Sequence, residues 1–140
     1  MFNSSERKDY FINECCYGDD LAHALMDQLR SHGIETASEP GQEDFGWYFG
    51  FRTGSVDYQF VIGHRPADEG DPVVWIGWLE RKAGLLGTMF GARNRGIQPD
   101  AASIIDLAIS SLPEVSHIRW HRKKDFDAGL EKYGRAAPSA

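Results

Sequence analysis

Two neighbouring carboxylates, Glu43 and Asp44, are the first candidates for acid–base chemistry, and they follow Pro40 and Gly41. Catalytic carboxylates often act in pairs on one substrate atom. Neighbouring side chains on an extended chain point in opposite directions, so these two are poorly placed to converge. Acidic residues after a Pro-Gly turn are typical of loops, and we favour that interpretation.

Thiol and metal chemistry need partners at a recognisable spacing. Cys15 and Cys16 are neighbours in the chain, where a disulfide would be strained. His117 and His121 would stand about 13 Å apart along a strand, too far to share a metal ion without other ligands. No histidine–cysteine spacing matches a zinc site. The sequence therefore predicts no catalytic residue, no metal ligand and no cofactor, and it favours a protein that is not an enzyme.

A glycine-rich segment, residues 84–96, carries Phe90, Arg93 and Arg95. It connects a predicted strand to a predicted helix, where free amides and the helix dipole favour anions. Neither the Walker A motif nor the dinucleotide fingerprint is present. Three interpretations stay open: an apolar plug under the sheet, a loop that binds a protein partner, and a site for a small anion.

The densest aromatic run predicts a central strand over residues 45–53. Alternation along a strand assigns four rings to the buried face, Phe45, Trp47, Phe49 and Phe51. The opposite face holds Gly46, Tyr48, Gly50 and Arg52. Because the two glycines leave that face thin, either a helix or ring packs into the space, or a shallow groove runs there with Tyr48 and Arg52 on its rim.

Periodicity and turn residues predict the other elements. These are a strand at 10–17, a helix capped by Asp19 or Asp20 and ended by Gly33, a loop at 34–42, strands at 56–64 and 73–80, a helix between Pro99 and Pro113, and a last strand at 115–121. On residues 73–80 both faces are apolar, with Trp75 on one and Trp78 on the other. Such a strand lies in the middle of a sheet, or one of its faces meets a partner or a second copy of the chain.

This order predicts an α+β fold: a two-layer sandwich with a mostly antiparallel sheet of about five strands and two helices on one face. In order, the elements are strand, helix, three strands, helix and strand. A chain of 140 residues is one domain, 1–140. The ends, 1–9 and about 127–140, lack a core-forming pattern, and we expect them to be loose.

Charge restricts the partners. The formal net charge of −6 disfavours nucleic acid and suits a basic protein partner. The basic tail after Arg119 keeps nucleic-acid binding as the last-ranked alternative. No apolar run approaches the ~20 residues that span a bilayer, and the N-terminal residues do not form a secretory signal. We therefore expect a cytoplasmic protein without a membrane partner.

Several short aromatic motifs occur in order: Glu43-Asp44-Phe45-Gly46-Trp47, Trp75-Ile76-Gly77-Trp78, Leu85-Leu86-Gly87, Phe90-Gly91 and Ile118-Arg119-Trp120. In this combination, over residues 34–121, the chain resembles a set of small uncharacterised bacterial proteins. The resemblance implies a shared core, and it carries no established activity or catalytic residue.

Two hypotheses follow. The first is a non-catalytic interaction protein, for example one that resembles a bacterial antitoxin or immunity protein, or a homodimer formed through the Trp78 face. The second is a binder of a small anionic ligand, or an enzyme, that uses the 84–96 loop. The candidate binding residues for the two hypotheses together are Tyr48, Arg52, Trp78, Phe90, Arg93 and Arg95.

Overall fold

The computed structural model describes residues 1–13, 16–66, 68–82 and 96–137. Over these residues the fold is α+β, with helices and a five-stranded antiparallel sheet, as the sequence predicts. In chain order the elements are α1 (Asp19–Ser31), β1 (Glu35–Thr36), β2 (Gly41–Glu43), β3 (Gly46–Thr53), β4 (Val56–Arg65), β5 (Val74–Arg81), α3 (Pro99–Ser110), α4 (Lys123–Asp127) and the 3-10 helix η2 (Glu131–Tyr133).

The β3–β4 hairpin is the centre of the sheet. Its strands pair from Trp47 opposite Ile62 to Thr53 opposite Val56, and the two-residue turn contains Gly54 at a φ of 56°. Alternate side chains on both strands are buried in the main hydrophobic core, namely Trp47, Phe49, Phe51, Tyr58, Phe60 and Ile62. The predicted pairing of the two strands is thus confirmed.

Helix α1 packs on this core through Leu21, Leu25, Met26 and Leu29, which recur at three- and four-residue steps. Gly33 follows its end with a φ of 75°, the left-handed conformation expected there. The predicted cap at the start is wrong. Gly18 takes the N-cap position, while the two aspartates after it lie inside the first turn.

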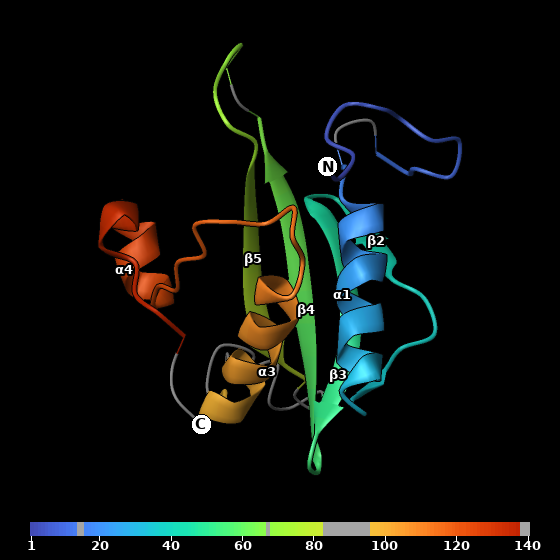
Figure 1. Cartoon of the computed structure of the whole chain (residues 1–140), viewed down its shortest axis with the longest axis vertical. Helices are drawn as coiled ribbons and strands as arrows, with labels where there is room; N and C mark the ends of the chain where they lie inside the picture. The colour runs from blue at the N-terminus through green and yellow to red at the C-terminus, as the bar shows by residue number, and fades with distance from the viewer. Residues whose placement is uncertain (14–15, 67, 83–95, 138–140) are drawn as a thin grey trace.

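Helix α3 begins at Pro99, as predicted, because a proline ring suits the first turn. Its buried residues include Ile105 and Ala108. The amide of Gln98, just before the helix, donates a hydrogen bond of 3.3 Å to the Tyr58 hydroxyl in the core. Figure 1 shows α1 and α3 side by side in front of the sheet, and their apolar residues belong to one core cluster. We call the side of the sheet away from these helices the outer face.

The predicted strands at 10–17 and 115–121 are wrong. In the first stretch Phe11 is buried, but the described residues form turns and bends rather than a ladder. In the second, His117 has a φ of 58°, which interrupts an extended chain, and Trp120 makes only an isolated bridge to Arg135. Aromatic composition at these sites reflects packing onto the core, which does not require strand pairing.

The segment 34–42, predicted as a loop, instead supplies the two remaining strands. β1 pairs with β3 through Glu35 opposite Arg52, and β2 pairs with β3 through Gly41 opposite Tyr48. Both strands are only two or three residues long. They are too short to show an alternating pattern.

Phe45 was predicted to be buried, and this is wrong: its side chain is 52% exposed. β2 and β3 pair up to Glu43 opposite Gly46, so the two residues between them form the turn of a tight hairpin. The buried alternation therefore begins at Trp47. A Cβ atom on Gly46 would lie 1.9 Å from the Ile62 carbonyl oxygen, so the close approach of β4 requires glycine here.

The strand predicted at 73–80 forms as β5, at Val74–Arg81. Of the two predicted alternatives, a place in the middle of the sheet is wrong, because the order β1-β3-β4-β5 puts this strand at one edge of the described sheet. The other alternative, a face that meets a partner, stays a prediction. Trp75 packs against the core, whereas Ile76 and Trp78 project from the outer face.

Within the described residues, no helix combines the length and apolar character that a membrane crossing needs.

Looseness of the chain ends stays a prediction. In this structure Asn3 and Lys8 form hydrogen bonds to the start of α1, and residues 131–135 contain η2 and the bridge to Trp120. Both ends of the described chain therefore make specific contacts with other elements.

We expect Gly46→Ala to lower the free energy of unfolding by about 3 kcal/mol, the upper end of the cost of overpacking, because the added methyl group meets the β4 backbone. Gly54→Ala is the control. Nothing lies within 4 Å of its Cβ position, and only its positive φ of 56° opposes the change, at about 1–2 kcal/mol. Urea unfolding followed by tryptophan fluorescence measures both values. Equal losses would contradict the close approach at Gly46.

Candidate interaction surface

An apolar cluster lies on the outer face of the sheet, which we call the aromatic patch: Phe45, Tyr48, Val61, Ile76 and Trp78. Strand register creates it. Tyr48 on β3 pairs with Val61 on β4, and Val61 pairs with Trp78 on β5, so these three form one row across the sheet. Two of the predicted site residues, Tyr48 and Trp78, are therefore brought together.

The hairpin turn extends this row. The ring of Phe45 lies 5.1 Å from that of Trp78, at an angle of 49°. Val61 is only 1% exposed although it lies on the face away from α1 and α3. The Trp78 indole N–H donates a hydrogen bond of 3.1 Å to Glu80, which holds the ring along β5. The patch thus has a packed centre and an exposed ring, Phe45, at its margin.

Arg52, the third predicted site residue within the described chain, lies away from the patch in a row of charges. Its guanidinium donates hydrogen bonds of 2.7 and 3.2 Å to both oxygens of Asp57, and it lies 3.7 Å from Glu35. The hydrogen bond from Arg52 lowers the pKa of Asp57, and the same bond raises the pKa of Arg52. Arg52 therefore already forms ion pairs with two carboxylates.

A shallow hollow of about 160 Å³ lies beside this row, over Gly50. A Cβ atom at Gly50 would lie 2.8 Å from the Lys82 ammonium nitrogen, so the lysine covers the thin part of β3. Arg52 lines the hollow, together with Lys82, Glu35 and Asp57, while Tyr48 does not. Two positive and two negative groups balance one another, and this composition gives an anionic ligand no electrostatic preference.

The remaining predicted site residues, Phe90, Arg93 and Arg95, lie outside the described residues, as do Cys15 and almost all of the 84–96 loop. Among the described residues, no group of three or more His, Cys, Asp or Glu side chains could hold a metal ion.

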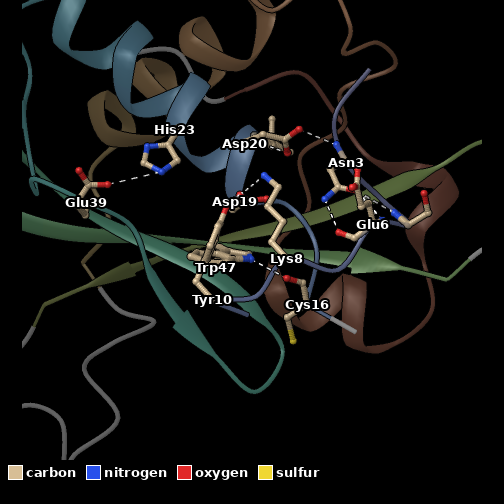
Figure 2. Close-up of polar contacts among 12 residues, drawn as sticks. Asn3, Glu6, Lys8, Tyr10, Cys16, Asp19, Asp20, His23, Glu39 and Trp47 are labelled. Carbon is tan, nitrogen blue, oxygen red and sulfur yellow. Dashed lines mark hydrogen bonds and ion pairs between the residues drawn. The ribbon is translucent and has the colours of Figure 1, made fainter. Parts of the chain in front are cut away.

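A second polar cluster, missed by the sequence analysis, joins the N-terminal segment to α1. Figure 2 shows Lys8 and Tyr10 converging on Asp19, which is 2% exposed. One carboxylate oxygen, Oδ2, accepts hydrogen bonds from the Lys8 ammonium at 2.6 Å and from the Tyr10 hydroxyl. The other oxygen, Oδ1, is buried without a hydrogen-bond partner. No sequence pattern indicates this cluster, because its members come from an irregular segment and a helix.

The protonation states in this cluster depend on one another. Burial alone would raise the pKa of Asp19, but the hydrogen bonds from Lys8 and Tyr10 outweigh it, and the pKa lies below its ordinary value. The hydrogen bond to Asp19 raises the pKa of Lys8. Clusters of shifted groups often mark active sites. Here both donors, the Lys8 ammonium and the Tyr10 hydroxyl, bond to Asp19. The cluster therefore holds residues 8–10 against the start of α1.

His64 lies apart from this cluster, and burial lowers the pKa of its imidazole. Its ring lies between Tyr17 at 5.8 Å and Trp75 at 5.2 Å, both edge to face. His64 has aromatic rings on two sides and no ion pair within the described residues. Its role is therefore to pack between these rings. Neither this residue nor Asp19 belongs to the aromatic patch.

No family model, no curated protein and no solved structure matches this chain. A proposal about its function therefore has to be based on the geometry of the structure.

We expect Asp19→Asn to lower the free energy of unfolding by about 1.5 kcal/mol at pH 7. Hydrogen bonds to charged groups contribute about 1.5–3 kcal/mol, and the lower end applies because Lys8 is partly exposed to solvent. The Asp19 pKa is lowered on folding, so its contribution is present above about pH 3.9 and is lost as the pH falls through the folded value. The Lys8 pKa is raised, so its contribution is lost only as the pH rises beyond about 10.4.

Urea unfolding at pH 2, 5, 7 and 9 measures this difference between wild type and Asp19→Asn. Asp27→Asn, on the exposed side of the same helix, is the control, and we expect it to have little effect. A wild-type advantage as large at pH 2 as at pH 7 would show that the Asp19 charge does not fasten the N-terminal segment.

Proposed function

We propose that this chain is a non-catalytic protein-interaction domain that acts in the bacterial cytoplasm and binds another protein chain through the aromatic patch. The observation that carries the proposal is the position of Trp78. It lies on the outer face of an edge strand and packs against the exposed ring of Phe45, whereas the core is built on the opposite side of the sheet.

Energetic considerations support this use of the patch. Tryptophan and tyrosine contribute most to many protein interfaces, because large rigid rings bury much area at a small entropic cost. Phe45 is 52% exposed and Val74, further along β5 on the same face, is 38% exposed. A fold that needed only its core would not require these apolar residues on the outer face.

Two kinds of partner fit the patch. One is a different protein with a basic surface, as in an antitoxin-like or immunity-like pairing, since the net charge of this chain is −6. The other is a second copy related by two-fold symmetry, in which each Trp78 meets the same face of its partner. Native mass spectrometry of the protein purified from its own host distinguishes them by mass. A bound small molecule and no second chain would contradict the interaction function.

Trp75 and Trp78 offer a matched test because they lie on opposite faces of one strand. We expect Trp78→Ala to weaken partner binding at least tenfold, as for a typical interface hot spot, with little change in unfolding free energy. Trp75 packs against the core but is only partly buried, so we expect Trp75→Ala to cost about 2 kcal/mol of stability instead, less than the ~3–5 kcal/mol of a fully buried tryptophan. Calorimetric titration and urea unfolding measure the two effects.

A cross-linking experiment tests the same surface without truncating it. A photoreactive phenylalanine analogue at Ile76 should capture the partner chain in host cells. The same analogue at Leu107, which is 49% exposed on α3, should not. Capture at Leu107 alone, or unchanged binding in Trp78→Ala, would exclude the aromatic patch as the interface.

A further inference from the structure

The C-terminal residues 119–135 form a small lobe beside the sheet. It contains α4 and η2, and its two ends are joined where Trp120 and Arg135 exchange backbone hydrogen bonds of 2.8 Å in both directions. Figure 1 shows α4 set apart from α1, on the β5 side of the molecule. We call this segment the C-terminal lobe.

Two polar contacts fasten the lobe to the rest of the fold. The Trp120 indole N–H donates a hydrogen bond of 2.7 Å to Asp106 on α3. The guanidinium of Arg65, at the end of β4, donates bonds of 2.9 and 2.8 Å to the two carboxylate oxygens of Glu131. A bidentate pair of this kind fixes orientation as well as distance. The lobe is therefore held in a defined position relative to the sheet.

Contacts inside the lobe add to this order. His121 Nε2 donates a hydrogen bond of 2.6 Å to the Glu131 carbonyl, because a carbonyl can only accept. At Gly134 a Cβ atom would lie 2.6 Å from the Arg119 Cβ and 2.7 Å from the His121 ring. The two sides of the lobe thus approach so closely that a larger residue would separate them.

The lobe carries a concentrated positive charge. Its six basic residues are all exposed: Arg119, Arg122, Lys123, Lys124, Lys132 and Arg135. Of these six, only Lys123 makes an ion pair with another described residue, Asp127 at 2.6 Å. Two of the three acidic residues of the lobe, Asp127 and Glu131, are already paired. Most of the positive charge therefore faces solvent without a counter-charge from the described residues.

The rest of the chain has the opposite sign. The whole chain has 15 Lys and Arg residues, six of them in the lobe, and 21 Asp and Glu residues, three of them in the lobe. The rest of the chain therefore holds nine basic against eighteen acidic residues. Charge is thus segregated along the chain. A surface of this kind selects partners by electrostatic complementarity.

We propose that the C-terminal lobe is a second docking surface, which binds an acidic segment of a protein partner. Two exposed apolar side chains accompany the charge, Leu130 at 41% and Tyr133 at 63% exposure. The Lys132 ammonium lies 5.0 Å from the centre of the Tyr133 ring. Exposed aromatic and aliphatic groups among basic residues suit a peptide that carries carboxylates next to apolar side chains.

The dimensions favour a short acidic segment over a nucleic acid. Ten base pairs of duplex extend about 34 Å, at 3.4 Å per phosphate along each strand. A domain of this length has a radius of gyration of only about 14 Å. A duplex centred on the lobe would therefore extend along the acidic remainder of the chain and be repelled, whereas a segment of a few residues would not.

A fluorescein-labelled six-residue peptide of glutamate, aspartate and leucine, which spans about 20 Å when extended, serves as the probe, with binding followed by anisotropy. We expect the double variant Arg122→Gln/Lys124→Gln to bind it about five- to tenfold more weakly, since each exposed pair contributes modestly. We also expect wild-type affinity to fall as salt rises. Arg81→Gln/Lys82→Gln, which removes the same two charges at the end of β5, is the control and should bind like wild type.

Each outcome decides the proposal. A loss confined to the lobe variant supports it. Equal losses in both double variants would show attraction by net charge alone, and the lobe would have no special role. The absence of binding, or tighter binding of a six-nucleotide single strand or of phosphatidylserine vesicles than of the peptide, would overturn it. Melting curves of both variants confirm that they fold.

Discussion

Burial of one face of the β3–β4 hairpin under α1 and α3 is the constraint on which the rest of the structure depends. Phe49 and Tyr58 are completely buried in that layer, between the sheet and both helices. Since strand side chains alternate, every residue that enters this core forces its neighbours onto the outer face. The core therefore determines which positions form the aromatic patch but not which residues occupy them. The core does not require apolar residues at Ile76 and Trp78, and the proposed interface would use both.

Sequence patterns predicted the parts of the fold whose signals are local. The hairpin follows from alternation around Gly54, and the helices follow from apolar spacing with Gly33 and Pro99 at their ends. The errors have a common cause, because hydrophobic composition reports burial rather than backbone pairing. Phe11 and Trp120 pack on the core from irregular segments, while β1 and β2 are too short to show a period.

The candidate surface was predictable only in part. Tyr48 and Trp78 could each be assigned to a face of a strand, but their alignment depends on β4 lying between them in a particular register. The cluster around Asp19 had no signal, because hydrogen bonds between an irregular segment and a helix follow no spacing rule. Arg52 illustrates the converse. Its charge suggests a ligand site, and the structure shows it paired with Asp57 across the hairpin.

Basic residues are concentrated in the C-terminal lobe and acidic residues in the rest of the chain, and a need for solubility does not explain this separation. Soluble proteins usually intersperse both signs over the surface, because large fields of one sign attract unwanted partners. Here the two residues that hold the C-terminal lobe, Asp106 and Arg65, carry one negative and one positive charge. Their contacts therefore do not change the net positive charge of the lobe. An acidic body and a basic lobe also attract one another between copies. The C-terminal lobe, held in a defined position, is the surface at which we propose that an acidic segment docks, and the aromatic patch on the outer face is then available for a different contact.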